Sequence, residues 1–529
     1  MEALMQHLKK EYGMRIVKYY GILFACLCTK VVVPLGISWT IDKLTLKECI
    51  QASYWGALLI LFLSEFILTI LKGRMNIKLS NKIAFRIEGK LLQHIAESEY
   101  SVIRKYDNAY LAQRVNNDAV IFGDYFCEKF PYFVFDVLGV LSILVVIICK
   151  SVYLGFILTV GCMVYVIFYC FFSKYMYVLV EDMLQTQAEF FAMLSGQFRD
   201  VLFTKIHALK REKENEFDET TSRFYNASIK YLNMDVLLNN SGLSFGRILY
   251  LLVFIATSIR ITKMGISPGY LTALILYIDF IITKLNEAFL FAEHRQKYLL
   301  AKKRIMELLN MDSEKQGTFK CRSVESIEMI NAVVDFGNKV IVYPRIQMKK
   351  GKVYVINGEN GAGKSTIINL LLGIEHLKKG EVCFNGVSLE KIDKEDLRRK
   401  LIAVATQDSF LCNGTLEQNI LYGVDNKNDL LMKECTAGFL EYAENRGGLL
   451  LRVRKNNTEL SGGEKQKIVI SRAFSKAADV YVFDEPYNNL DESSRKLFLE
   501  LVSQIKDKIV IIISHDLEIN RIADEVIAL

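Results

Sequence analysis

The fold of the C-terminal part of the chain is decided by Val353-Tyr-Val-Ile-Asn-Gly-Glu-Asn-Gly-Ala-Gly-Lys-Ser-Thr366. A short β-branched run leads into the spacing G-x-x-x-x-G-K-[ST], and an apolar helical run follows as far as Leu372. Glycines at this spacing let backbone N–H groups turn inward at a helix N-terminus, whose dipole favours anions. The strand, turn and helix together predict a phosphate-binding loop and disfavour a glycine turn without a ligand.

The residue types of this loop indicate a nucleotide as its ligand. Lys364 can reach the β- and γ-phosphates of ATP, and the Ser365 hydroxyl can ligate Mg²⁺. The nucleotide-binding residues predicted here are Gly358, Asn360, Gly361, Gly363, Lys364, Ser365 and Thr366.

A second strand-like run, Val480–Phe483, ends in the two carboxylates Asp484 and Glu485. An apolar strand with this ending is common, but here it follows a phosphate-binding loop. In that context Asp484 is expected to hold the water shell of the metal, and Glu485 to polarise the attacking water.

Between these two patterns stands Leu460-Ser-Gly-Gly-Glu464, which resembles the LSGGQ signature of ABC ATPases and departs from it only at the last residue. A hydroxyl and bare backbone amides at a helix N-terminus suit a phosphate. The resemblance implies that Ser461, Gly462 and Gly463 bind ATP held by the phosphate-binding loop of an opposite subunit, which requires a dimer.

Further positions are carried over from the ABC family one by one. Gln407 matches the glutamine that contacts Mg²⁺, His515 the histidine that holds the γ-phosphate, and Asp491 the aspartate of the D-loop. Phe336 lies about where the family stacks an aromatic ring on adenine, although Tyr343 is nearby. The resemblance thus implies the catalytic residues Glu485, His515 and Gln407, and the Mg²⁺ ligands Ser365, Gln407 and Asp484.

The N-terminal part has the composition of a membrane protein. Hydrophobic residues make up 51% of the chain, and their excess lies almost wholly before residue 295. Crossing a bilayer takes about 20 apolar residues. Six runs are long enough, near residues 16–41, 53–73, 130–149, 153–178, 236–262 and 267–291.

Two long charged inserts separate spans two and three, and spans four and five. Their lysines and arginines place them, with both termini, on the cytoplasmic side of the cell membrane. Apolar residues recur in both, so we expect cytoplasmic extensions of the spanning helices. The net charge of +7 is mild and forms no basic stripe, which argues against nucleic acid as a partner.

Six spans, two cytoplasmic inserts and a fused C-terminal ATPase resemble a type I ABC exporter half-transporter. The implied fold is a membrane α-helical bundle joined to a P-loop α/β ATPase domain. Its strands are expected at Lys352–Asn357, Leu401–Ala405, Val480–Phe483 and Ile509–Ser514. The expected domains are 1–310 for the membrane part, 311–325 for a linker, and 326–529 for an ATPase shortened at its C-terminus.

The expected activity is ATP-driven export by alternating access, with ATP and Mg²⁺ as cofactors. An importer of metal chelates with the same architecture stays open, whereas the six spans argue against a soluble ABC ATPase. Intact catalytic residues favour a homodimer, and a heterodimer stays open. A peptide or another polar or amphipathic compound is the expected substrate.

Ionisable residues within the spans are candidates for substrate contact, with mutual pairing between helices as the alternative. Span five adds a polar notch at Asn239, Asn240 and Ser241. Two departures from the family bear on coupling: Lys455 stands where a glutamate is usual, and Asn488-Asn489 where Ser-Ala is usual. The ionisable candidates are Lys30, Glu65, Asp136, Arg247 and Asp279.

Overall fold

The computed structural model describes residues 2–106, 108–264, 267–337, 339–359, 361–407, 410–444, 446–454 and 460–529. The chain divides into two compact units. The first consists of residues 1–96 and 107–310, and the second of residues 97–106 and 311–529. Residues 97–106, which the sequence places in the membrane domain, therefore fold with the second unit.

The first unit is built from helices. They are α1 (Glu2–Thr45), α2 (Ala52–Glu97), α4 (Asn108–Asp124), the π-helical turn η1 (Tyr125–Lys129), α5 (Phe130–Lys150), α6 (Val152–Arg199), α7 (Val201–Ile206), α8 (Lys210–Met264) and α9 (Pro268–Leu309).

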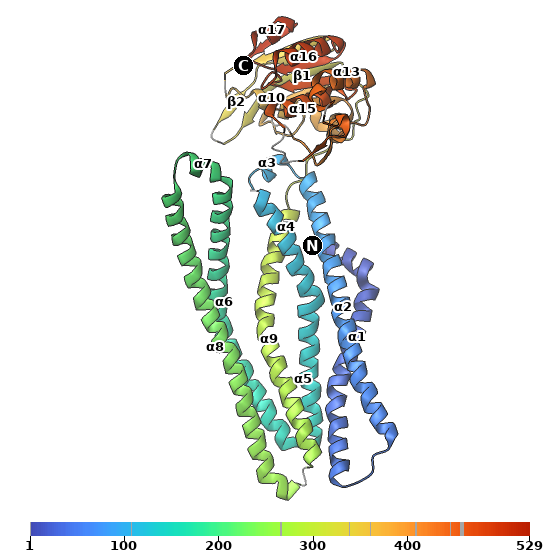
Figure 1. Cartoon of the computed structure of the whole chain (residues 1–529), viewed down its shortest axis with the longest axis vertical. Helices are drawn as coiled ribbons and strands as arrows, with labels where there is room; N and C mark the ends of the chain where they lie inside the picture. The colour runs from blue at the N-terminus through green and yellow to red at the C-terminus, as the bar shows by residue number, and fades with distance from the viewer. Residues whose placement is uncertain are drawn as a thin grey trace. The chain divides into compact units, whose positions relative to one another are not determined.

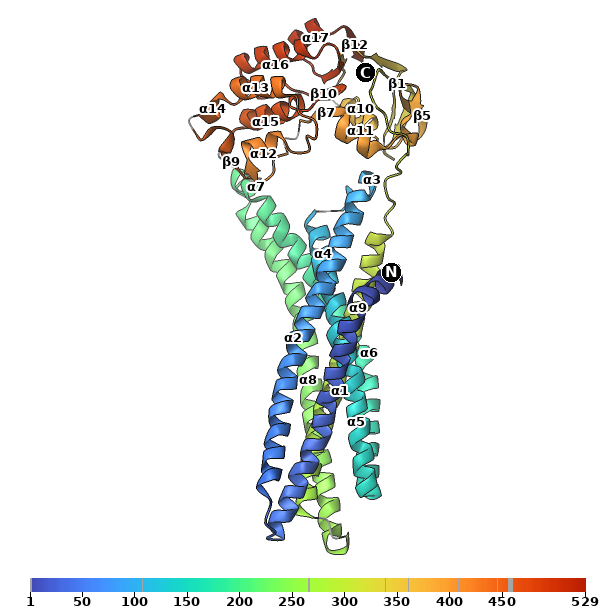
Figure 2. The same cartoon turned by 90° about the vertical axis from the view of Figure 1, so that its right-hand side faces the viewer.

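Most of these helices are longer than a bilayer requires. α2, α6 and α8 contain 46, 48 and 55 residues, so both inserts are helical extensions of the spans, as predicted. Figure 1 shows α6 and α8 as a pair closed at one end by α7, and Figure 2 shows the same bundle from the side.

Among the described residues, five helical stretches are long and apolar enough to cross a membrane, in α1, α2, α4–α5, α6 and α8. The sixth predicted span lies in α9 and is not one of these five. α9 carries Asp279, Lys284 and Glu287 within residues 267–291, so its crossing stays a prediction.

The start of α9 is fixed by a carboxylate from α1. Ser267 caps α9, and Pro268 follows where a missing N–H does no harm. Asp42 accepts hydrogen bonds from the Ser267 hydroxyl at 2.7 Å and from the Gly269 N–H at 2.8 Å. This contact ties the first and last long helices of the bundle together.

Several of the polar residues predicted for the spans are satisfied within the bundle. Lys30 of α1 forms an ion pair with Glu65 of α2. Asn240 and Ser241 donate to backbone carbonyls of their own helix, at 2.8 and 2.7 Å, while the Asn239 side chain lies outside the described residues. For Lys30 and Glu65 the alternative of mutual pairing therefore holds, and Arg247 and Asp279 stay predictions.

The second unit contains a parallel sheet in the order β12-β4-β11-β10-β7. Its interior strands are almost continuously apolar, as burial on both faces requires. The four strands predicted from sequence are all present, to within a residue at each end. The bounds are β12 (Glu525–Ala528), β4 (Lys352–Asn357), β11 (Ile509–Ile513), β10 (Val480–Asp484) and β7 (Ile402–Ala405).

A second, antiparallel sheet was not predicted from sequence. It consists of β1 (Ser326–Asp335), β2 (Val340–Val342), β3 (Ile346–Lys349), β5 (Lys379–Phe384) and β6 (Val387–Ser388). The helices of this unit are α3 (Tyr100–Ile103), α10 (Lys364–Leu371), α11 (Lys394–Lys400), α12 (Leu416–Ile420), α13 (Asp429–Phe439), α14 (Glu441–Glu444), α15 (Gly462–Phe474), α16 (Glu492–Gln504) and α17 (Leu517–Ile522).

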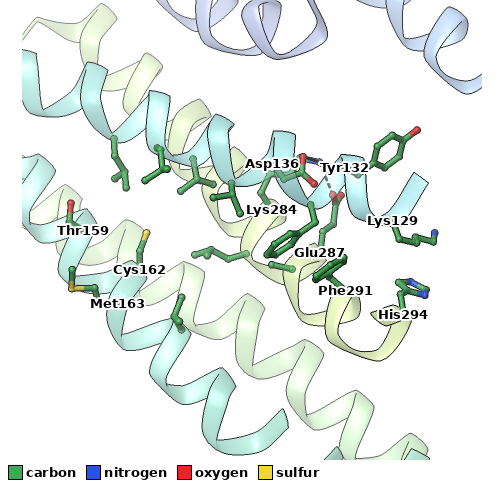
Figure 3. Close-up of a pocket in the computed structure, with 18 of the residues that line it drawn as sticks. Lys129, Tyr132, Asp136, Thr159, Cys162, Met163, Lys284, Glu287, Phe291 and His294 are labelled. Carbon is green, nitrogen blue, oxygen red and sulfur yellow. Dashed lines mark hydrogen bonds and ion pairs between the residues drawn. The ribbon is translucent and has the colours of Figure 1, made fainter. Parts of the chain in front are cut away.

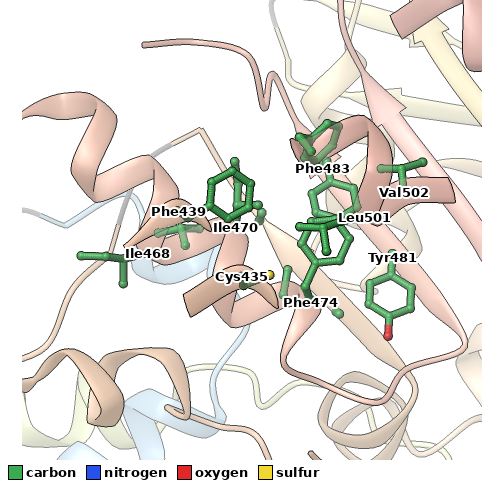
Figure 4. Packing of buried hydrophobic residues seen from close by; sticks show 14 of the residues in the cluster. Cys435, Phe439, Ile468, Ile470, Phe474, Tyr481, Phe483, Leu501 and Val502 are labelled. Atoms are coloured by element: carbon green, nitrogen blue, oxygen red, sulfur yellow. The ribbon is translucent and has the colours of Figure 1, made fainter. Parts of the chain in front are cut away.

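The parallel sheet separates two hydrophobic cores. Figure 2 shows α13, α15 and α16 on one side of β10, with β1 and β5 on the other. Between the sheet and the three helices lies an aromatic cluster, part of which Figure 4 shows. Phe498 of α16 is fully buried there, with its ring centroid 5.0 Å from that of Phe483 and 5.9 Å from that of Phe474.

Truncating this ring should destabilise the second unit strongly. Replacing a buried phenylalanine by alanine costs about 3–5 kcal/mol, so we expect Phe498→Ala to lower the opening free energy of β10 and β11 by about that amount. Hydrogen exchange of their backbone amides in the full-length protein measures it. Leu430→Ala on the exposed face of α13 is the control, and equal exchange in both variants would contradict the packing described.

Candidate nucleotide site

The phosphate-binding loop connects β4 to α10. Gly363 has a φ of +97°, which a residue with a side chain rarely adopts, and it stands at the N-cap of α10. The Lys364 ammonium folds back across the loop and donates to the carbonyl of Gly358 at 2.7 Å. Two side chains brace the loop from outside, because Tyr343 donates to the Gly363 carbonyl at 2.8 Å and Lys339 to that of Gly361 at 2.6 Å.

The predicted catalytic residues meet because their strands are neighbours. Parallel strands end at one edge of a sheet, and here β4, β11, β10 and β7 lie in that order. The edge therefore carries, in sequence, the phosphate-binding loop, His515, Glu485 and Gln407. Lys364 Nζ contacts His515 Nε2 directly, so the two side chains expected to bind the γ-phosphate lie next to each other.

Glu485 is held in a defined position. Its φ of +49° is unusual for a residue with a side chain, and its N–H donates to the Ile513 carbonyl at 2.9 Å. Its Oε2 accepts hydrogen bonds from Asn488 Nδ2 at 2.5 Å and from Gln407 Nε2 at 3.5 Å. Both donors therefore meet the same carboxylate oxygen of Glu485.

The signature residues begin α15 in a capping box. The Ser461 hydroxyl accepts from the Glu464 N–H at 3.2 Å, and the Glu464 carboxylate accepts from the Ser461 N–H at 2.6 Å. The departure from the family glutamine thus gives this helix a charged N-terminal cap. Gly463 is required by its neighbour, since a Cβ there would collide with the Asn489 carbonyl oxygen.

The D-loop is fastened to the signature helix by an ion pair. Lys467 of α15 lies 2.7 Å from the Asp491 carboxylate, and Asp491 caps α16 by accepting from the Ser494 N–H at 2.8 Å. The hydrogen bond from Lys467, followed by those from Ser494, holds the pKa of Asp491 well below its ordinary value. Asp491 is therefore ionised at neutral pH.

The predicted metal ligands suit Mg²⁺ in their chemistry. Asp484 ends β10 as a buried carboxylate, and Ser365 exposes its hydroxyl on the first turn of α10. Mg²⁺ prefers oxygen ligands and usually takes one or two carboxylates with phosphates and waters. A hydroxyl, an amide oxygen from Gln407 and one carboxylate fit that preference, and no group of three His, Cys, Asp or Glu that could hold a metal ion occurs among the described residues.

Other predicted residues have different outcomes. Asn360 and Lys455 lie outside the described residues. Phe336 follows β1, and its ring centroid is 5.4 Å from the Arg104 guanidinium carbon. A cation therefore already lies against this ring, and its contact with adenine stays a prediction.

Sequence reasoning missed the residues that support the site. Asn488 stood out only as a departure from the family that bears on coupling, and its contact with Glu485 was not predicted. Lys339, Tyr343 and Lys467 contact the loops through folding of distant segments, and none of them belongs to a motif.

Comparison with known proteins identifies the family of both parts of the chain. Residues 344–488 match a family described as ABC transporter, and residues 19–285 match the ABC transporter transmembrane region. A bacterial Atm1-family ABC exporter structure with ATP bound superposes with a TM-score of 0.84 and 17% identity, covering 98% of this chain and 93% of that one.

Curated relatives align over different shares of their length. An uncharacterized ABC transporter ATP-binding protein of Haemophilus influenzae is 25% identical over 59% of this chain, which spans 56% of that relative. An ATP-dependent lipid A-core flippase of Mannheimia succiniciproducens is 23% identical over 85% of this chain and 79% of its own length. The lactococcin-G-processing and transport ATP-binding protein LagD of Lactococcus lactis is 29% identical over 44% of this chain and 35% of its own length.

Removing the Asn488 amide should slow hydrolysis without weakening ATP binding. A hydrogen bond to a charged group contributes about 1.5–3 kcal/mol, so we expect Asn488→Ala to lower kcat about tenfold or more at an unchanged KM for ATP. Phosphate release by the purified protein measures both constants. Asn426→Ala, at an exposed asparagine of the same unit, is the control, and equal turnover in the two variants would remove Asn488 from the site.

Proposed function

Because this chain belongs to the ABC transporter family, in which ATP hydrolysis drives transport across a membrane, we propose that two copies of it form an exporter. Its substrate is a peptide or another amphipathic compound with polar groups. The observation that carries the proposal is the row of Lys364, His515, Glu485 and Gln407 at one edge of the parallel sheet.

These residues divide the work of hydrolysis between them. The glycine-rich loop and Lys364 hold the β- and γ-phosphates. Glu485 orients a water through Oε1 while Asn488 and Gln407 hold Oε2. His515 leaves Lys364 and binds the γ-phosphate, whose charge Lys364 then also neutralises.

Mg²⁺ belongs to the proposed site as well. When bound, it neutralises charge on the β- and γ-phosphate oxygens. Ser365, Asp484 and Gln407 would hold it.

Two features support a dimer of identical chains. The base, the histidine and the signature serine are all intact, so two copies give two competent sites. In addition, α7 exposes an apolar surface on a very short helix: Leu202, Phe203 and Ile206 are 71%, 56% and 67% exposed. We propose that this surface binds the second unit of the other copy. Conformational changes at the nucleotide site of one copy would then be transmitted to the helices of the other.

Replacing the base should separate ATP binding from hydrolysis. We expect Glu485→Gln to abolish phosphate release, because an amide cannot accept the proton of the water. The variant should still retain ATP after gel filtration, since the phosphate contacts are untouched. Glu492→Gln, at an exposed glutamate paired with Lys496, is the control, and normal hydrolysis by Glu485→Gln would refute the assignment of the base.

The dimer can be tested without a substrate. Two copies of the chain with different affinity tags, expressed together, should purify as a mixed complex through either tag. Mixing them after separate purification controls for exchange. Recovery of each tag alone would contradict the homodimer.

A further inference from the structure

The first unit contains a cavity of about 760 Å³ between α5, α6 and α9, with Lys72 of α2 at its border. Its volume lies in the range of small-molecule sites. Figure 3 shows the side chains that line it and the two interactions within its charged part.

The lining changes in character from one end of the cavity to the other. Toward the α5–α6 turn it is almost wholly apolar, with Val140, Leu144, Cys162 and Met163, and the apolar side chains of Val166 and Ile167 continue along α6. The opposite end gathers the charged side chains of Lys72, Glu128, Lys129, Asp136, Lys284 and Glu287, and also the ring of Phe291. Figure 3 shows Asp136, Lys284 and Glu287 at this end, apart from Cys162 and Met163.

One lysine at the charged end serves two carboxylates. Lys284 lies 3.1 Å from Asp136 and 2.7 Å from Glu287. Asp136 is largely enclosed, with 20% of its side chain exposed, whereas 48% of Glu287 is exposed. This triad carries one negative charge in excess, and Glu287 is the member that a ligand can reach.

Among the other charged side chains at this end, Lys72 has no carboxylate partner in the described part of the chain. Glu128 is satisfied by Lys129 and by the Asn76 amide, each at 2.7 Å. Within the described part of the chain, Lys72 lies over the ring of Tyr132, 4.5 Å from its centroid, and forms no ion pair with a carboxylate. The lining also contains His294, whose pKa is lowered by burial, which favours the neutral imidazole. The remaining titratable charges are three carboxylates and three lysines, with a negative excess at Glu287 and a positive excess at Lys72.

We propose that this cavity binds an amphipathic zwitterion, with its protonated amine at Glu287, its acid group at Lys72 and its apolar body against α5 and α6. The inference rests on the proposed transport function and specifies its substrate. A balanced lining favours a ligand of zero net charge, because a net charge buried there would lack a partner.

Two kinds of molecule carry this chemistry. A short apolar peptide has a protonated N-terminus and a C-terminal carboxylate, and an aminophospholipid has an ammonium and a phosphate. The experiment therefore offers both and removes each charge in turn.

Binding is measured by equilibrium dialysis of a tritiated apolar pentapeptide against the full-length protein in detergent, without ATP. The charges are first removed from the peptide: N-acetylation removes the ammonium and C-amidation removes the carboxylate. This part of the test therefore needs only the wild-type protein. We expect each cap to weaken binding about tenfold, as loss of a charged hydrogen bond implies. Two lipids are tested as competitors of the labelled peptide. Lyso-phosphatidylethanolamine carries both the ammonium and the phosphate, whereas lyso-phosphatidylglycerol lacks the ammonium.

Protein variants assign each charge to its place. Glu287→Gln leaves Asp136 and Lys284 as a one-to-one pair, and it should weaken the free peptide about tenfold but leave the acetylated peptide unchanged. Lys72→Gln should weaken the free peptide but not the amidated one. Glu219→Gln and Lys210→Gln, at exposed pairs on α8, are the matched controls.

The outcomes separate cleanly. Charge-dependent binding of the peptide, or of the ethanolamine lipid alone, supports the inference and identifies the source. Capped and free ligands that bind alike, or variants that respond alike to both, would overturn it. Hydrolysis of ATP in the same preparations tests the proposed function separately, because dialysis requires no turnover.

Discussion

The nucleotide site depends on one geometric constraint, the common carboxyl edge of β4, β11, β10 and β7. Each strand delivers a different group to this edge, and the strand order decides which groups touch. Lys364 meets His515 because β4 pairs with β11, and Gln407 meets Glu485 because β7 pairs with β10. The aromatic cluster behind β10 packs Phe498 against Phe483, two residues before Glu485, which links packing around Phe498 to the position of Glu485.

In the helical unit a different constraint applies, because a charge in an apolar environment needs a partner. Lys30 and Glu65 meet that need one to one, which makes them a structural contact between α1 and α2. Asp136, Lys284 and Glu287 meet it two to one beside a cavity. The ratio of carboxylates to lysines, more than burial, distinguishes the two sets of residues. The Lys30–Glu65 pair is balanced and holds helices together, whereas the triad of Asp136, Lys284 and Glu287 has a carboxylate in excess that can bind a ligand.

The sequence predicted the parts of this protein that depend on local patterns. Long apolar runs gave the helices, β-branched runs gave the parallel strands, and glycine spacing gave the loop before Lys364. The antiparallel sheet was missed although β1 has ten residues and alternates between buried and less buried positions. Its partner strands β2, β3 and β6 contain only three, four and two residues, too few for a clear alternation in the sequence. The contact of Asn488 with Glu485, only three residues before it, was missed because it depends on the turn that Glu485 makes at positive φ. Lys467 was missed because its contact with Asp491 joins α15 to the start of α16, and Lys284 and Glu287 because only α9 packing against α5 brings them to Asp136.

The loop from Asn488 to Asp491 has a consequence for the timing of the cycle. Asn488 donates to Glu485, the proposed base of its own site, while the Asn489 carbonyl lies close to Gly463 and the Asp491 carboxylate pairs with Lys467 of the signature helix. In the proposed dimer that helix grips the ATP of the other site. A shift of residues 488–491 would therefore weaken the binding of ATP at one site and displace Glu485 from its water at the other. The two sites would then hydrolyse ATP in turn and not at the same time.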